Sequence, residues 1–252
     1  MSESASSYKE VKYYSVWDRT TRLFHWINVI CIVGLSTLGV AILNYKVLGV
    51  HADGKILLKT IHAYIGYAFV LNLLWRFIWA FVGNEFSRWG SILPIGKGYW
   101  QSLREYMHGL RAGDPPQYLG HNPLAKLMVA FLFLLLSLQS ITGLVLAGTD
   151  LYLPPFGHEI AEWVAPPGAS HEDIAALKPG SKEGVNPETY AEMRDLRKPI
   201  ANTHYYTFYI LLIAIVLHIV AVVYTEVKEK NGIISAMFTG KKFVFKKLVE
   251  KE

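Results

Sequence analysis

Apolar residues in this sequence occur in long blocks, rather than in the short periodic stripes that are typical of a soluble domain. Four stretches, each about as long as a bilayer is thick, are free or nearly free of Asp, Glu, Lys and Arg, and Arg76 interrupts the second. At about 1.5 Å rise per residue, some twenty residues cross the roughly 30 Å hydrocarbon core. The sequence therefore predicts an all-α integral membrane four-helix bundle, a single domain over residues 1–252 with spans at about 23–45, 60–84, 124–149 and 199–225.

Positive charge is distributed unevenly among the segments that connect these spans. Fifteen Lys and Arg residues fall in the amino-terminal lead, in the connection between spans two and three, and in the tail 226–252. The first connection and the loop 150–198 together carry eight, and that loop adds nine acidic residues. Because cytoplasmic loops are enriched in Lys and Arg, both termini are predicted to be cytoplasmic and the loop 150–198 to lie outside. The net charge of +5 reflects this asymmetry, and nothing in it indicates nucleic acid.

Two further expectations concern the ends of the chain. The first span follows a polar lead of some twenty residues and has no small-residue cleavage site, so we expect it to be retained rather than removed as a signal. Four basic residues of the tail are candidates for contact with anionic lipid head groups of the bilayer: Lys241, Lys242, Lys246 and Lys247.

Four of the nine histidines fall within the predicted spans, at two depths. His62 and His204 lie toward the outer ends of spans two and four, whereas His25 and His218 lie toward the cytoplasm in spans one and four. His204 and His218 are fourteen residues apart, about 21 Å along one helix and within about 40° of the same face. Each depth thus receives two imidazoles from two helices, as a six-coordinate haem iron requires. The sequence predicts two b haems, and the single cysteine, Cys31, excludes a Cys-x-x-Cys-His site for covalent attachment.

Each of these features also has a purely structural interpretation. A histidine in an apolar helix can hydrogen-bond to a neighbouring helix, although four ionisable side chains in two depth-matched pairs favour ligation. Arg22 and Arg76 are candidate partners for haem propionates or simple interface anchors, and we expect Arg76 to extend to the cytoplasmic interface. Glycines inside the spans either make room for a porphyrin or allow close helix packing: Gly34, Gly39, Gly66 and Gly143.

A candidate quinone site lies at the cytoplasmic end of span three. A quinone needs a hydrogen-bond donor and, on reduction, a proton source, and His121, Asn122 and Lys126 could supply these. Asn122 before Pro123 is also a good N-cap for a helix whose first residue is proline.

Two connecting segments are long. Aromatic residues between spans two and three, among them Trp89 and Trp100, indicate a segment that lies against the head groups. The outer loop 150–198 contains Pro154-Pro155 and Pro166-Pro167, and its sequence predicts short helical turns at best. It is either a docking surface for an external partner or a solvated insertion.

At these residues the chain resembles the b-type cytochrome subunit of membrane-bound nickel–iron hydrogenases, a family of bacterial di-haem cytochromes b. The resemblance runs from about Val16 to Phe245 and includes the spacing of His204 and His218. Its other elements are Arg22-Leu23-Phe24-His25-Trp26, His62 with Arg76 and Gly83-Asn84, Tyr99-Trp100-Gln101, Gly120-His121-Asn122-Pro123-Leu124-Ala125 and Ser235-Ala236-Met237-Phe238-Thr239-Gly240. The long outer loop departs from the family's pattern.

The resemblance implies a transmembrane electron-transfer subunit in the bacterial cytoplasmic (inner) membrane. It would anchor periplasmic hydrogenase small and large subunits and pass electrons from hydrogen to membrane quinone. His62 and His204 would hold the haem nearest the external partner, and His25 and His218 the inner one. Three alternatives stay open: a cytochrome subunit of a formate dehydrogenase or thiosulfate reductase, a free-standing oxidoreductase from superoxide or another small donor to quinone, and a membrane anchor without redox function. The sequence also leaves open whether copies of the chain form a homo-oligomer.

Overall fold

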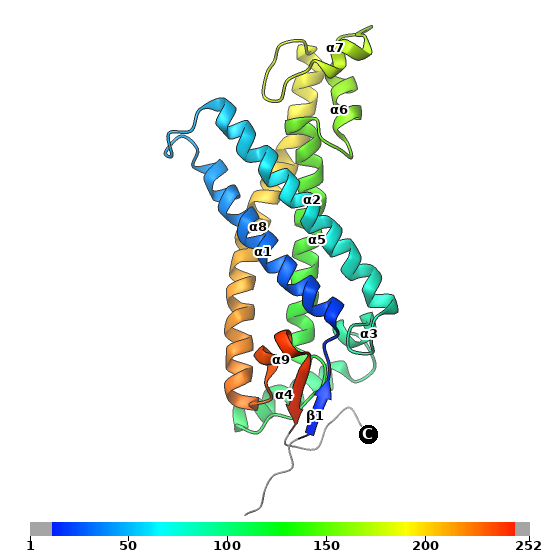
Figure 1. The fold of residues 1–252 in the computed structure, drawn as a ribbon, viewed down its shortest axis with the longest axis vertical. Coiled ribbons are helices and arrows are strands. Elements are labelled where there is room, and N and C mark those ends of the chain that lie inside the picture. Colours follow the sequence, from blue (N-terminus) through cyan, green and yellow to red (C-terminus); the bar gives the residue numbers. More distant parts are fainter. Residues whose placement is uncertain (1–11, 245–252) are drawn as a thin grey trace, which may run out of the picture. The chain divides into compact units, whose positions relative to one another are not determined.

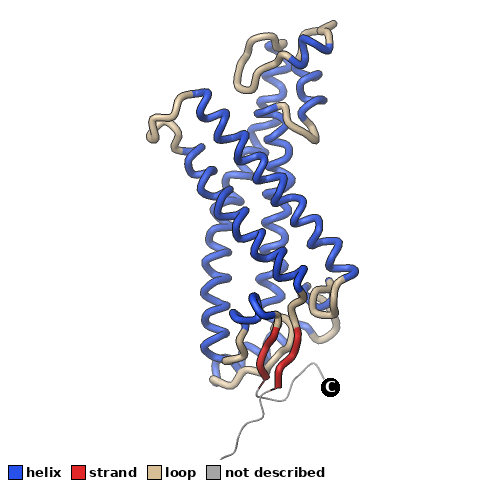
Figure 2. Tube along the Cα trace, in the orientation of Figure 1, coloured by secondary structure: helices blue, strands red, loops and turns tan. Residues whose placement is uncertain are grey.

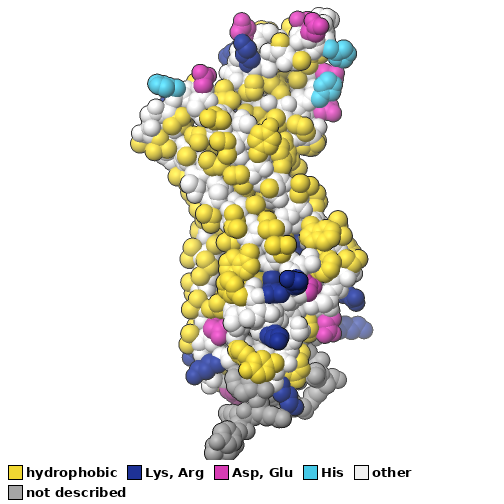
Figure 3. Space-filling view, viewed as in Figure 1, with side chains coloured by type: hydrophobic (Ala, Val, Ile, Leu, Met, Phe, Trp, Pro, Cys, Tyr) yellow, Lys and Arg dark blue, Asp and Glu magenta, His cyan; other side chains and the backbone are white. Residues whose placement is uncertain are grey.

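Four long helices dominate the protein in a computed structural model, in which residues 12–244 are described (Figures 1 and 2). Each of the four is long and apolar enough to cross a membrane, as the hydrophobic blocks predict. They are α1 (Arg19–Leu43), α2 (Ala52–Val82), α5 (Pro123–Leu151) and α8 (Pro187–Glu229). On the face shown in Figure 3, hydrophobic side chains cover these helices and charged side chains concentrate in the segments beyond them.

The fourth long helix begins earlier than the sequence suggests. α8 starts at Pro187, so the charged residues before 199 are helical and Pro199 lies inside the helix. The predicted span begins only after these charged residues, but hydropathy measures preference for lipid and does not limit the helical backbone. Two short helices, α6 (Gly157–Val164) and α7 (His171–Ala175), occupy the preceding loop.

Short elements also lie before α1, between α2 and α5, and after α8. α3 (Trp89–Ile92) and α4 (Tyr99–Ala112) connect α2 to α5, and α9 (Ile233–Thr239) follows α8. The strands β1 (Lys12–Ser15) and β2 (Lys241–Val244) pair antiparallel, with Tyr13 opposite Phe243 and their rings edge to face at 5.1 Å. A buried cluster beside the strands contains Val16, Trp17, Leu119 and Ala236.

The strand pair changes the interpretation of the basic tail. Lys242 is 2% exposed, and its Nζ donates a hydrogen bond to the Gly120 carbonyl at 3.1 Å. The prediction that Lys242 contacts lipid head groups is therefore wrong, because strand pairing turns this side chain inward. Lys246 and Lys247 lie outside the described residues.

The chain divides into two compact units, and each contains a part of every long helix. Among the described residues, the first unit comprises 12–25, 76–133 and 213–244, and the second comprises 26–75 and 134–212. His25 and His218 belong to the first unit, whereas His62 and His204 belong to the second. The prediction of a single membrane domain stays a prediction.

A buried polar network ties together the first unit. The Tyr106 hydroxyl donates to Glu229 Oε1 at 2.7 Å and accepts from Asn122 Nδ2 at 2.8 Å. Asn231 Nδ2 donates to the other carboxylate oxygen of Glu229 at 2.6 Å. Hydrogen bonds to both oxygens offset the cost of burying this carboxylate, so the network fixes the end of α8 against α4 and the start of α5.

Candidate functional site

His62 of α2 and His204 of α8 face each other in the second unit. Their ring centroids are 6.4 Å apart and their planes are inclined by 71°. A metal held between two imidazole nitrogens, each at the roughly 2.0–2.1 Å usual for a first-row transition metal, would place the ring centres roughly 6–6.5 Å apart. The pair is thus already spaced for one iron atom between two axial imidazoles.

A largely apolar cavity of about 430 Å³ surrounds this pair, within the size range of cofactor pockets. Three glycines line it: a Cβ atom would lie 3.8 Å from His62 Cε1 at Gly39 and 3.4 Å from His204 Cε1 at Gly143, and at Gly66 it would meet open space. These glycines leave room beside both imidazoles. The cavity, the apolar lining and the ring spacing together fit a flat, apolar cofactor with a central metal. Gly34, in contrast, lies against Ile65 at ordinary packing distance.

A hydrogen bond orients the His204 ring. Thr142 Oγ1 lies 2.8 Å from His204 Nδ1 and 2.7 Å from the Leu138 carbonyl. A hydroxyl carries one proton, which Thr142 donates to the carbonyl, so the imidazole donates its Nδ1 proton to Thr142. This tautomer leaves the lone pair of His204 Nε2 available to a metal, and such support of a ligand is common in metal sites.

Removing the Thr142 hydroxyl tests this support. We expect Thr142→Val, which keeps the side-chain shape, to weaken haem binding at the His62/His204 pair by about 10- to 100-fold, because the ring loses its orienting acceptor. The measurement is a haem titration of the detergent-solubilised apoprotein, followed by absorbance. Thr37→Val is the matched control, because Thr37 is exposed and its hydroxyl donates to the Val33 carbonyl of the same helix, α1. Equal affinities in the two variants would remove Thr142 from the site.

His25 of α1 and His218 of α8 lie close enough in the first unit to interact electrostatically. The structure thus brings together both histidine pairs that the sequence proposes, and ligation by them stays a prediction. Arg76 belongs to the same unit and is buried, with 4% of its surface exposed. Its Nη1 donates to the Ser87 carbonyl at 3.1 Å. Its guanidinium lies 5.8 Å and 5.6 Å from the ring centres of Phe24 and Phe133.

Arg76 thus extends past the end of α2 and is buried there by the residues that follow, which provide an acceptor; that it reaches the membrane interface stays a prediction. Arg22 also has a structural partner: it donates to the Phe238 carbonyl and so fixes the end of α9. Contact of either arginine with a propionate stays a prediction.

Asp18 organises the start of α1. Its Oδ1 accepts from the Thr21 backbone at 2.7 Å, and its Oδ2 accepts from Trp79 Nε1 at 2.9 Å and from Ser87 Oγ at 3.1 Å. Burial by itself raises the pKa of the Asp18 carboxyl, but these hydrogen bonds outweigh burial and lower the pKa below its ordinary value. The ionised carboxylate caps α1 and links it to the end of α2, and His25 lies about two turns further along α1.

The candidate quinone residues adjoin this region. His121 packs against Trp17 with ring centroids 4.7 Å apart, and burial together with Lys242, Arg76 and Lys126 lowers its pKa to about 3. His121 is therefore neutral at physiological pH. Asn122 Oδ1 accepts from the Ala125 backbone at 2.7 Å, so Asn122 caps α5, the alternative that its sequence context suggests.

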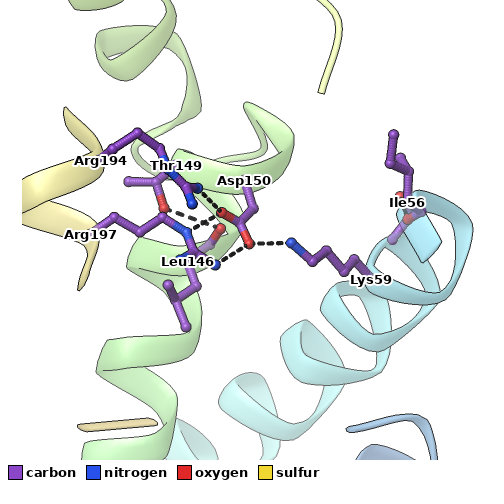
Figure 4. Close-up of polar contacts among 8 residues, drawn as sticks. Ile56, Lys59, Leu146, Thr149, Asp150, Arg194 and Arg197 are labelled. Atoms are coloured by element: carbon purple, nitrogen blue, oxygen red, sulfur yellow. Dashed lines mark hydrogen bonds and ion pairs between the residues drawn. The ribbon is translucent and has the colours of Figure 1, made fainter. Parts of the chain in front are cut away.

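Sequence reasoning missed three charged residues that line the same cavity as His62 and His204: Lys59, Asp150 and Arg197. Figure 4 shows Lys59 of α2 and Arg194 and Arg197 of α8 converging on Asp150 of α5. All of these residues lie at or beyond the predicted ends of the spans, where a charged side chain indicates a loop. Helical spacing could have found them, because Lys59 precedes His62 by three residues and Arg197 precedes His204 by seven.

The similar proteins named below share one description, a probable Ni/Fe-hydrogenase B-type cytochrome subunit. A probable Ni/Fe-hydrogenase B-type cytochrome subunit of Cupriavidus necator is 24% identical over 245 residues, covering 94% of this chain and 90% of that protein. A protein of the same description from Rhizobium leguminosarum bv. viciae is 26% identical and covers 90% and 87%. In Escherichia coli K12, a probable Ni/Fe-hydrogenase 1 B-type cytochrome subunit is 32% identical, covering 52% and 59%. The family model of prokaryotic cytochrome b561 matches residues 16–240, and the chain therefore belongs to this family of membrane cytochromes.

Proposed function

We propose that the chain is the transmembrane electron-transfer subunit of a nickel–iron hydrogenase, taking electrons from periplasmic small and large subunits to membrane quinone through b haems. As a member of a cytochrome b family, it is a multi-pass protein of the cytoplasmic membrane that carries haem b. The observation that carries the proposal is the His62–His204 pair, spaced at 6.4 Å inside an apolar cavity. The relatives' names supply the hydrogenase as partner.

Haem b, when bound, supplies reversible one-electron chemistry. His62 and His204 would hold one haem, and His25 and His218 would hold the other. Thr142 orients His204, the glycines beside the first pair leave room for the ring, and the largely apolar lining of the cavity suits the apolar body of the group. These contributions set the orientation and surroundings of the group, which are the means by which a protein tunes its potential.

Quinone contact is proposed near His121 and Lys126, with Asn122 holding the start of α5. Because the pKa of His121 is lowered to about 3, its imidazole is neutral at physiological pH. A neutral imidazole has one N–H group, which can donate a hydrogen bond to a quinone carbonyl. On the opposite side of the predicted membrane, α6, α7 and the first turns of α8 form the proposed docking surface for the periplasmic subunits. Both termini are proposed to be cytoplasmic.

Purification of the tagged chain from its native membranes in mild detergent tests this function. We expect hydrogenase small and large subunits to co-purify, and hydrogen to reduce the b haem and added quinone. The chain expressed without those subunits is the control and should show the haem spectrum with no response to hydrogen. A chain that purifies alone and reduces quinone with superoxide would instead be a free-standing oxidoreductase. Co-purification of a formate dehydrogenase or thiosulfate reductase would reassign the partner.

A further inference from the structure

Three helices bring a cluster of charges to the cavity that holds His62 and His204. Lys59, Asp150 and Arg197 line this cavity together with the two histidines, and Figure 4 shows the three side chains pointing toward one another. Asp150 is the centre of the cluster. Its Oδ2 accepts from Lys59 Nζ at 2.6 Å and from Arg197 Nη2 at 2.7 Å, while Arg197 Nε donates to its Oδ1.

The cluster holds more positive than negative charge. Arg194 is a further cation, with Nη1 3.9 Å from Asp150 Oδ1. Within residues 12–244, the ion pairs of all three cations are with Asp150, so one carboxylate faces three positive groups. The side chains of Asp150, Lys59 and Arg197 are 9%, 27% and 19% exposed, whereas that of Arg194 is 49% exposed and can be screened by solvent. Lys59 and Arg197 are the cations that face the cavity.

Both of these cations keep donors beyond those that Asp150 uses. An ammonium has three N–H groups and a guanidinium five, and the contacts with Asp150 take one from Lys59 and two from Arg197. Partly buried cations beside an apolar cavity are costly unless an anion offsets them. Carboxylates are the anions that Arg binds best, through paired hydrogen bonds. A ligand of this cavity that carries carboxylates would satisfy both the charge and the donors.

We propose that Lys59 and Arg197 bind the propionate carboxylates of the haem at the His62/His204 pair, and that Asp150 is the positioning residue that holds both cations. The proposal rests on the proposed haem function and deepens it. It assigns to the second unit the role that the sequence gives to Arg22 and Arg76, which donate hydrogen bonds to the Phe238 and Ser87 carbonyls of the first unit. The competing interpretation is an ion network that only ties α2, α5 and α8 together.

Chemical modification of the ligand separates the two interpretations. The full-length apoprotein with His25→Ala, which confines binding to the His62/His204 pair, is titrated with haem b and with haem b whose two propionates are methyl esters. We expect the diester to bind at least about tenfold more weakly, because charge-assisted hydrogen bonds are lost. In Lys59→Met/Arg197→Gln, haem b should fall to the affinity of the diester, and the diester itself should be unaffected. The midpoint potential of the bound haem should also shift in the double variant.

Matched variants control for damage to the helices. Arg194→Gln weakens the network at Asp150 without reaching the cavity, and Lys55→Met removes a lysine one turn from Lys59 whose ammonium lies over the Tyr45 ring at 3.9 Å. Both should bind haem b as the parent does.

The outcomes also separate this proposal from the proposed function. Equal affinity of the parent for haem b and its diester would overturn the propionate assignment and leave haem binding intact, even if the double variant fails to fold. Equal weakening of both ligands in the double variant would favour the structural network and overturn it as well. A parent that binds neither ligand would instead contradict the haem site itself.

Discussion

His204→Ala is expected to lower the haem content of the purified chain from about two haems per polypeptide to about one. The loss is expected because the substitution removes one of the two proposed haem ligands, and with it the pairing of two imidazoles across the cavity. His25→Ala should remove the other haem and leave the His62/His204 site filled, so the double variant should hold none. Haem per polypeptide, from the pyridine haemochrome spectrum and the protein concentration, is the measurement.

His51→Ala is the control for these variants, since His51 is exposed in the connection between α1 and α2. It should keep the parent's haem content. If the parent holds a single haem and His25→Ala leaves it unaltered, the site at His25 and His218 is wrong. If His204→Ala retains every haem, the assignment at His62 and His204 fails, and the cavity must serve another ligand.

The histidine pairs could be found from sequence because helical geometry is regular. Fourteen residues separate His204 from His218, and this spacing alone returns the second ring to nearly the same helix face. The alternating direction of the spans then matches His62 to His204 and His25 to His218. In the structure the first two rings are 6.4 Å apart, and the second two are close enough to interact electrostatically. What the spacing could not show is the 6.4 Å separation or the cavity, because both depend on how neighbouring helices pack.

Charged residues at helix ends were harder to interpret. Lys59, Asp150 and Arg197 fall outside the apolar blocks, so hydropathy assigned them to loops, although helix and cavity continue through them. The sequence favours lipid interfaces for Arg76 and Lys242, where isolated basic side chains usually lie, but both side chains are buried. Their acceptors are the carbonyls of Ser87 and Gly120. Neither carbonyl can be identified from sequence, because backbone acceptors carry no residue signature and the second is 122 residues distant.

Filling the cavity with a side chain is expected to exclude haem from the His62/His204 pair without unfolding the chain. Gly66 lies one turn after His62 on α2, and a Cβ atom at Gly66 would meet no atom within 4 Å. Gly66→Phe therefore places an aromatic ring in space that the apoprotein leaves open. We expect haem content to fall from about two to about one per polypeptide, with both axial histidines still present.

The same substitution distinguishes a cofactor cavity from close helix packing, the other interpretation of glycine in a membrane helix. If Gly66 serves packing, a phenyl group must force helices apart, and the thermal unfolding midpoint of the apoprotein should drop along with every bound haem. If it borders a cofactor cavity, the apoprotein midpoint should hold or rise, because the ring fills a void that otherwise forfeits van der Waals contacts. Gly90→Phe is the control: a Cβ atom there also meets open space, but Gly90 is exposed on α3 and does not line the cavity. Selective loss of one haem in Gly66→Phe, with both retained in Gly90→Phe, would thus locate the cofactor by its volume, independently of its ligands.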